Sequence, residues 1–362
     1  MVTLPLQKFS FVLEQRKRNA VAWWLLAGVA MIIIQTLLGG VTRLTGSGLS
    51  ITKWDPIFGI LPPLNTKQWE DAFSSYKQIG QYKFVNSAFT LSDFKSIFFW
   101  EWLHRVWARM LGVVFAVGFV YFLLKRSFDK QMIRPFVVLF ILGGLQGVVG
   151  ILMVKSGVNP EDVHVNYTWL AAHFISAMIL ACYTLWFALI LLIPAEKRVA
   201  NKNANTFTLA TIGILFLQLM YGAFMAGLKA ANAASTWPDI NGSYLPDTVF
   251  KNGLLKDVNL SALMINVHFM HRTIAYILLA MVIAWFAYLR RNVNLGTLKS
   301  VINWPLMLVL LQVVMGIITV LVSPKIVLGK FGIFETFAQV HQLVAMFLLM
   351  ALVVNLYVVK RR

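Results

Sequence analysis

Residues 101–124 read EWLHRVWARMLGVVFAVGFVYFLL, and this stretch decides the fold class of the chain. From Leu111 onward it is an apolar run of the kind that crosses a bilayer, since a spanning helix needs about 20 mostly apolar residues. At its start stand a carboxylate, a histidine and two arginines, which are costly in a membrane segment and usually functional there. The stretch therefore predicts a transmembrane helix with a site near the point where it enters the membrane.

The rest of the chain repeats this apolar pattern. Of its 362 residues, 59% are hydrophobic and only 13% are charged, whereas soluble domains carry roughly 25% charged residues. We therefore expect an all-α integral membrane protein. Its eight spans are predicted at about 21–41, 102–124, 133–154, 168–193, 207–228, 267–289, 302–322 and 335–358.

The net charge of +18 is distributed in a way that favours a membrane over a nucleic-acid partner. Lys and Arg cluster at alternate ends of the spans, which is the positive-inside pattern. It predicts that both termini lie in the cytoplasm and that segments 43–99 and 229–266 lie outside. The first twenty residues lack a signal-peptide pattern and are only weakly of the transit type, so we expect a bacterial plasma membrane. The single Cys182 lies inside a span, so no intramolecular disulfide is possible.

Four stretches recur in the same order, three of them at a nearly fixed spacing. LHR at 103–105 matches MHR at 270–272, LQGVVGI at 145–151 matches LQVVMGI at 311–317, and AAHFISAM at 171–178 matches QVHQLVAM at 339–346, with offsets of 166 to 168. A weaker match joins 39–56 to 222–239. The pattern predicts two tandem four-helix bundles related by a pseudo-two-fold axis along the membrane normal. The expected divisions are a cytoplasmic segment 1–20, a first unit 21–194, a linker 195–206 and a second unit 207–362.

Small residues interrupt several of these spans. We expect them to let neighbouring helices pack closely. They are Gly143, Gly144, Gly147, Gly150 and Gly316.

Four of the six histidines occupy repeat-equivalent positions, His104 and His173 in the first unit and His271 and His341 in the second. Each lies a few residues inside the outer end of its span, so each unit presents two facing imidazoles at one depth. Such a pair binds haem iron axially in helix bundles, whereas zinc takes a third or fourth protein ligand. The pattern favours haem over a metal ion, with helix–helix hydrogen bonding as the alternative. His164 is expected to be an ordinary loop residue.

Other polar side chains accompany the histidines. Glu101 precedes His104 by three residues, as His268 precedes His271, and residues at this spacing share a helix face. Glu101 is either paired with a neighbouring arginine or a proton acceptor beside a bound substrate. Arg105 and Arg272 are candidates for binding haem propionates or lipid headgroups.

Several motifs together resemble the haem A synthase family. They are GGVTRLTGSGLSITKWDPIFGILPP at 39–63, FKSIFFWEWLHRVWARMLG at 94–112, GILMVKSGV at 150–158, AAHF at 171–174, and the later HR and VHQ. The resemblance extends over about 20–358, and it is to the form without paired cysteines in the first outer loop. Ala108 stands where the family often has glycine, and the second-half outer loop is a looser match.

The resemblance implies an eight-helix oxidoreductase that converts the ring D methyl of haem O to a formyl through a hydroxylated intermediate, giving haem A for cytochrome oxidase. By position, His104 and His173 would flank the substrate haem O, and His271 and His341 would ligate a haem b cofactor. Glu101 would handle protons at the substrate. His268 is an alternative ligand in the second site.

The expected partners are haem O, the lipid bilayer, an electron acceptor and a haem O synthase as the source of haem O. The chief alternative is a di-haem electron carrier, which would leave both haems unchanged. A transporter with histidines in a proton relay is less favoured, because the spans lack broken midplane helices and midplane charges. In addition, residues 64–84 predict a short surface helix with Trp69, Phe73 and Tyr76 on one side, as a lid or a substrate contact.

Overall fold

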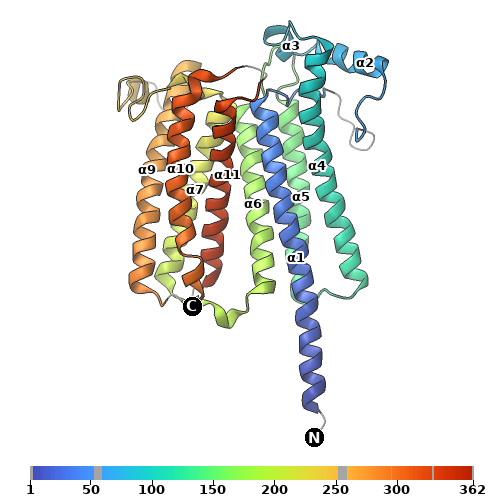
Figure 1. The fold of residues 1–362 in the computed structure, drawn as a ribbon, viewed down its shortest axis with the longest axis vertical. Helices are drawn as coiled ribbons and strands as arrows, with labels where there is room; N and C mark the ends of the chain where they lie inside the picture. The colour runs from blue at the N-terminus through green and yellow to red at the C-terminus, as the bar shows by residue number, and fades with distance from the viewer. Residues whose placement is uncertain (1–2, 53–58, 252–258, 295, 328–329, 361–362) are drawn as a thin grey trace.

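The computed structural model describes residues 3–52, 59–251, 259–294, 296–327 and 330–360. Within these ranges, eight helices are long and apolar enough to cross a membrane, and they stand side by side as one bundle (Figure 1). The prediction of an all-α, eight-span protein is confirmed. The eight helices are α1 (Thr3–Leu44), α4 (Leu91–Leu124), α5 (Lys130–Lys155), α6 (Tyr167–Leu192), α7 (Lys202–Gly227), α9 (Leu260–Asn292), α10 (Asn303–Val322) and α11 (Ile333–Val358).

The short elements lie at the two ends of the bundle. Both chain termini lie at one end, here called the terminal end, and α2 and α3 lie at the opposite, loop end (Figure 1). At the terminal end, the two-residue strands β1 and β2 pair in parallel, with Val199 opposite Val359. The short elements are α2 (Thr66–Tyr76), α3 (Gly80–Phe84), η1 (Ala195–Lys197), β1 (Val199–Ala200), η2 (Ala230–Ala233), α8 (Thr248–Lys251), η3 (Gly296–Ser300), η4 (Ser323–Lys325) and β2 (Val359–Lys360).

Helix α4 begins eleven residues earlier than its apolar run predicts, and α9 begins seven earlier. Local capping explains the longer α4, because Thr90 and Asp93 form a reciprocal capping box at its start. The first turn of α4 is also covered by the predicted surface helix, which is confirmed as α2. Phe73 of α2 is buried and stacks on Phe94 of α4, with ring centroids 5.0 Å apart. Apolar packing outside the spans thus holds the first turn of α4, the helix that carries His104, in place.

The two halves of the chain use the same helix neighbours. In the first half α1 packs against α4 and α6, and α6 against α5; in the second half α7 packs against α9 and α11, and α11 against α10. The halves meet where α6 packs on α7 and α11, and where α1 packs on α11. The largest buried cluster lies across this seam and includes Met178, Leu215, Trp285 and Leu349. These contacts agree with the predicted duplication, whose symmetry axis stays a prediction.

Candidate functional site

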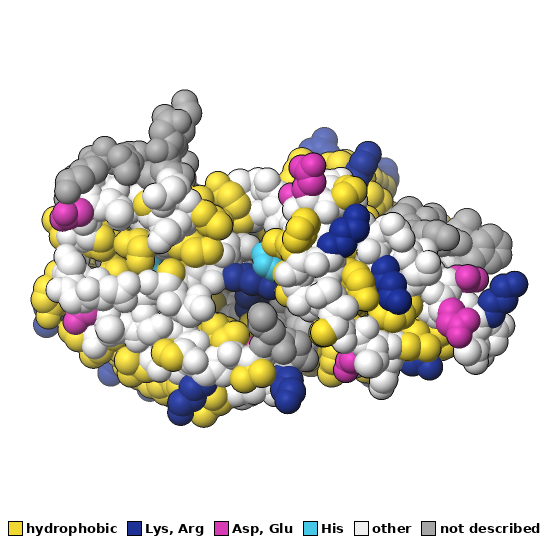
Figure 2. Space-filling view, turned by 90° about the horizontal axis from the view of Figure 1, so that it is seen from above, with side chains coloured by type: hydrophobic (Ala, Val, Ile, Leu, Met, Phe, Trp, Pro, Cys, Tyr) yellow, Lys and Arg dark blue, Asp and Glu magenta, His cyan; other side chains and the backbone are white. Residues whose placement is uncertain are grey.

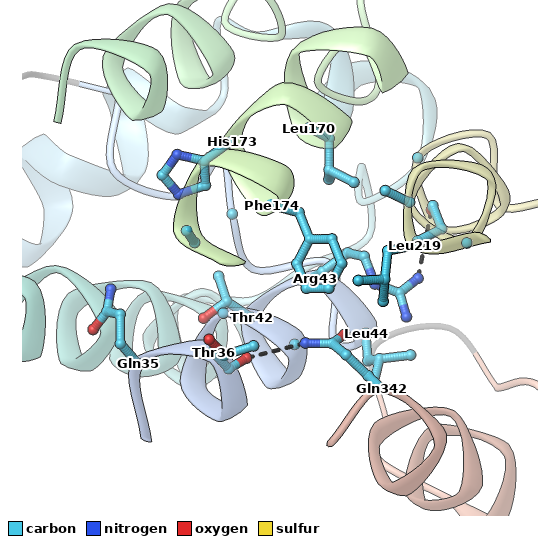
Figure 3. A pocket seen from close by; sticks show the side chains of 18 of the residues that line it. Gln35, Thr36, Thr42, Arg43, Leu44, Leu170, His173, Phe174, Leu219 and Gln342 are labelled. Carbon is cyan, nitrogen blue, oxygen red and sulfur yellow. Dashed lines mark hydrogen bonds between the residues drawn. The ribbon is translucent and has the colours of Figure 1, made fainter. Parts of the chain in front are cut away.

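A cavity of about 1130 Å³ extends between the helices toward the loop end. Side chains from all eight long helices line it, and the four repeat-equivalent histidines are among them. Figure 3 shows part of this cavity, with Gln35 of α1 and His173 of α6 on its opposite sides. The histidines that the sequence pattern picked out therefore share one space between the two halves.

His104 is held by two residues of the preceding long helix. The Gln35 side-chain nitrogen lies 3.2 Å from Nδ1 of the imidazole. One turn later, Gly39 lies so close to the ring that a Cβ there would come within 3.0 Å of Cε1. Glutamine and glycine four residues apart thus form a cradle, in which the amide orients the ring and the missing side chain makes room for it.

The same cradle occurs three more times. In each case the glutamine nitrogen lies 3.2–3.3 Å from a ring nitrogen, and a Cβ on the glycine would come within 2.9–3.2 Å of Cε1. The other three sets are Gln146, Gly150 and His173 on α5 and α6; Gln218, Gly222 and His271 on α7 and α9; and Gln312, Gly316 and His341 on α10 and α11.

The four cradles share a sequence signal, Gln-x-x-x-Gly, on the long helix before each histidine helix. It is visible at 35–39, 146–150, 218–222 and 312–316. We did not predict it, because Gly150 and Gly316 were interpreted as helix-packing residues. Comparing the four helices that precede the histidine helices with one another would have revealed that Gln-x-x-x-Gly recurs in each.

The two histidine pairs differ in how closely their rings approach. Among the described histidines, His271 and His341 are the pair whose rings are neighbours, with centroids 6.3 Å apart and planes inclined by 75°. If one iron atom lay between the rings, the distance between their centroids would be two metal–nitrogen bonds of about 2 Å each plus the radius of each imidazole ring. That sum is close to the distance found. The second pair is therefore spaced for one shared iron atom.

Hydrogen-bond acceptors beside the rings also fit metal-bound imidazoles. A ligating imidazole donates its other N–H to a nearby acceptor. His341 Nδ1 lies 3.1 Å from the backbone carbonyl of Gln312, and the buried Oε1 atoms of Gln35, Gln218 and Gln312 have no hydrogen-bond partner. Within the described part of the chain, no group of three or more His, Cys, Asp or Glu is arranged to hold a metal ion. Paired imidazoles with spare acceptors suit a haem, whose porphyrin supplies the remaining ligands.

Glu101 lines the cavity and is only 2% exposed. Its Oε1 pairs with the Arg105 guanidinium, and its Oε2 accepts hydrogen bonds from Ser50 Oγ at 2.7 Å and from the Ile51 backbone N–H at 2.8 Å. The salt bridge that the sequence offered as one interpretation is therefore present. These three donors hold the carboxylate one helical turn from His104, at the rim of the cavity.

Arg105 and Arg272 anchor the loops at the loop end. Arg105 donates to the carbonyl of Ile51 at 3.1 Å, and Arg272 donates to the carbonyl of Ala234 at 2.8 Å. Arg272 also donates to the carbonyls of Thr236 and Asp239. Equivalent arginines thus tie equivalent loops to their helices, and a contact of either with a bound haem stays a prediction.

The remaining two histidines both face the cavity. His268 is 1% exposed, and its Nε2 lies 2.8 Å from the carbonyl of Ala230 in η2. It therefore anchors a loop, as Glu101 does in the first half. His164 is half-buried and lines the cavity near Lys229. Burial, and to a lesser extent the positive charge of Lys229, lower the pKa of the His164 imidazole to about 4. His164 is a loop residue, as predicted, and the structure adds that it lines the cavity.

Three glycines of α5 do not pack against a neighbouring helix, contrary to our expectation. A Cβ on Gly143, Gly144 or Gly147 would meet nothing within 4 Å, and the same holds for Gly112 of α4. All four line the cavity. They leave a groove between α4 and α5, which is closed toward the terminal end by Phe115 and Phe140, with ring centroids 5.0 Å apart.

Larger residues stand at the equivalent positions of the second half. At the repeat offsets, Gly112 corresponds to Leu279, Gly143 to Val309 and Gly147 to Val313. Helix α9 packs along α10, whereas the backbones of α4 and α5 approach closely almost nowhere. The first half therefore offers an elongated apolar space beside its histidines, and larger side chains occupy that space in the second half.

Comparison with known proteins places this chain in a family. Residues 22–353 match the family model COX15-CtaA, described as cytochrome oxidase assembly protein. A protein named "Heme A synthase" from Flavobacterium johnsoniae is 36% identical over 353 residues, covering 95% of this chain and 98% of the relative. Proteins of that name from Parvibaculum lavamentivorans and Bradyrhizobium diazoefficiens are each 37% identical over 311 residues, covering 86% and 84% of this chain and 88% and 84% of the relatives. The chain belongs to the COX15-CtaA family of cytochrome oxidase assembly proteins.

Proposed function

We propose that this protein is a haem A synthase that oxidises the ring D methyl of haem O to a formyl, with the substrate in the first half and a resident haem b in the second. The observation that carries the proposal is the difference between the halves. Both hold a pair of cradled histidines, but the first has a buried carboxylate, Glu101, three residues before its histidine, where the second has His268, and the first adds the glycine-lined groove between α4 and α5. A substrate site needs both room for its substrate and a group that accepts protons.

The groove suits the long isoprenoid tail of haem O. Its walls are glycines, its end is aromatic, and it opens from the histidine cavity along the bundle. Apolar pockets with a few polar groups are typical of small-molecule sites. In the second half Leu279, Val309 and Val313 occupy the equivalent space, which suits a haem without such a tail.

Glu101 is the proposed proton acceptor. Oxidation of a methyl to a formyl with the oxygen of water releases protons and electrons; the electrons pass to the acceptor, and a carboxylate at the rim of the site can accept the protons. The Arg105 guanidinium, the Ser50 hydroxyl and the Ile51 N–H orient its oxygens. The side chain therefore stays in place while the substrate binds and leaves.

His271 and His341 would hold the resident haem b, with the Gln312 carbonyl accepting the Nδ1–H of His341. When bound, this haem supplies reversible one-electron iron chemistry. The cradles of Gln218 with Gly222 and of Gln312 with Gly316 fix the two rings before the haem arrives. Electrons leave to an acceptor outside this chain, and haem O comes from a haem O synthase.

We also place the terminal end in the cytoplasm of a bacterium and the loop end outside. Basic residues are concentrated at the terminal end, in keeping with the positive-inside rule. They include Arg18, Lys125, Arg126, Arg198, Arg290 and Arg291. The histidine cavity then lies toward the outer leaflet.

Expression with haem O synthase, in a host that makes no haem A, tests the activity directly. The extracted haems are separated by chromatography and identified by mass. Haem A or its hydroxylated precursor is the expected product. A folded, haem-loaded protein that yields only haem b and haem O would contradict the proposal and favour a di-haem electron carrier.

A further inference from the structure

Two basic side chains face the seam between the halves at the loop end, and neither belongs to the site predicted from the sequence. Arg43 stands in the last turn of α1, and Lys229 follows α7 directly. Both line the main cavity, together with His164 of the α5–α6 loop. Arg43 reaches from α1 toward α7 (Figure 3). Seen from above, basic side chains and a histidine lie together in the hollow at the middle of this face (Figure 2).

The Arg43 guanidinium has hydrogen-bonding capacity that the protein leaves unused. Its Nη1 donates to the carbonyl of Ala226 over 3.4 Å, which is long for such a bond. Its Nε is buried and has no partner. Glu335 of α11 attracts Arg43 electrostatically, but its Oε2 already accepts from the Gly332 N–H, and neither ion pair found in the described part of the chain includes Arg43.

Lys229 is held beside Arg43 by an unusual backbone. Its φ of 51° and ψ of 37° are left-handed, a conformation that residues other than glycine adopt rarely. Burial, and then the charge of Arg43, lower the pKa of Lys229 to about 8. Two cations that repel each other inside a cavity are stabilised when a bound anion neutralises them.

The position of Arg43 relates this cation pair to the first histidine site. Gly39, which contacts the His104 ring, precedes Arg43 by one helical turn, or about 6 Å along the axis toward the loop end. A porphyrin carries its two carboxylates at one edge of the ring. Arg105 and Arg272, the candidates for binding propionates in the sequence analysis, already bind loop carbonyls.

We propose that Arg43 and Lys229 form a carboxylate site at the seam between the halves, which binds the propionates of the substrate porphyrin and so orients its ring in the first half. An arginine fork can bind a carboxylate through two parallel hydrogen bonds, and Lys229 adds a second positive charge. The site lies inside the cavity between α1 and α7, so it faces the substrate and not the surrounding lipid. This inference rests on the proposed function, because it requires a porphyrin in the first half.

Binding of a matched pair of ligands tests the site. The protein, purified with its resident haem and reconstituted in phosphatidylcholine nanodiscs, is titrated with iron protoporphyrin IX and with its dimethyl ester, which lacks the carboxylates. Tryptophan quenching reports the dissociation constant. Arg43→Gln should weaken diacid binding about tenfold or more, and Lys229→Gln about three- to fivefold. The diester should bind equally to wild type and variants, and Lys83→Gln, an exposed change on α3, should alter neither ligand.

Three results would overturn the site. They are unchanged diacid binding in both variants, equal losses for diacid and diester, or a defect limited to binding of added phosphatidylglycerol, which would assign the cations to a lipid phosphate. The spectrum of the resident haem reports whether each variant is folded. If Arg43→Gln misfolds, Lys229→Gln, which lies outside the helices, still tests the site. The haem conversion assay separates the two proposals. If the wild-type protein binds the diacid more tightly than the diester but makes no haem A, only the proposed function is contradicted. If the protein makes haem A but the Arg43 and Lys229 variants bind the diacid as wild type does, only this site is contradicted.

Discussion

In the second half, Val309 and Val313 stand where the first half has Gly143 and Gly147, although the histidines beside them are cradled in the same way. The ring centroids of the second-half pair lie 6.3 Å apart. The first half combines its ring pair with a glycine groove and a buried carboxylate. The device that holds an imidazole is thus the same in both halves, and the different surroundings support the proposed substrate site in the first half and the proposed cofactor site in the second.

The largest expected effect is at Glu101, the carboxylate that stands where the second half has His268. Glu101→Gln keeps the size of the side chain and removes its charge, so haem conversion should fall by about 10² to 10⁴, the usual contribution of a general base. The amount of haem bound to the protein should stay unchanged. Glu70→Gln, an exposed change on α2, is the matched control. Normal haem A production by Glu101→Gln, measured by chromatography, would leave Glu101 with only its role in the salt bridge.

Exchanging the groove residues between the halves sharpens the comparison. Gly147→Val installs the second-half residue, and it should weaken binding of haem O by roughly ten- to a hundredfold, the usual range for an added group in an apolar pocket. Binding of tail-less haem b to the same half should change much less. The reciprocal Val313→Gly should leave haem O conversion unaltered. Equal losses for haem O and haem b would show that Gly147 matters for packing and not for the tail.

The cradles should act on each half separately. Gln312→Leu removes the amide beside His341, and the affinity for the resident haem should fall about tenfold, as is typical for partners that orient a metal ligand. Its reduction potential should also shift. Gln35→Leu should leave the resident haem spectrum intact and raise the KM for haem O. Identical potentials and affinities in Gln312→Leu and wild type would reduce the cradle to a packing feature.

The smallest expected effect is a pH dependence at the seam. Burial and Arg43 lower the pKa of Lys229 to about 8, while His164, with its pKa lowered to about 4, stays neutral. Lys229 is charged below its pKa, so diacid binding should be strongest there and weaken by at most about fivefold as the pH rises through and beyond 8. A bound carboxylate shifts the midpoint upward, and Glu335 of α11 also faces Arg43. Lys229→Gln should flatten the profile, and superimposable profiles would contradict this role.

The sequence predicted the spans and the four histidines well, because both depend on local patterns. Apolar runs determine which segments cross a membrane, and the recurrence of LHR with MHR identifies equivalent positions. Helix starts were less predictable, since the capping box of Thr90 and Asp93 extends α4 beyond its apolar run. These helix starts depend on polar residues that a hydrophobicity pattern does not weigh.

The surroundings of the site could not be predicted in the same way, because they depend on contacts between distant segments. Gly150 and Gly147 look alike in the sequence, yet one contacts His173 and the other faces open space. Arg43 gave no signal of its own, because the unpaired Nε of its guanidinium follows from how α1 meets α7. A glycine or an arginine in a span acquires its role only from the helix that faces it.

The central claim is that one repeated device serves a substrate in the first half and a resident haem in the second. The most direct test compares His173→Ala with His341→Ala, which remove equivalent ligands from the two halves, in cells that supply haem O. We predict that His341→Ala loses the low-spin spectrum of the resident haem, whereas His173→Ala keeps it and forms no haem A. Loss of the resident haem from His173→Ala with retention in His341→Ala, or an identical haem content in both variants, would contradict the assignment of the two halves.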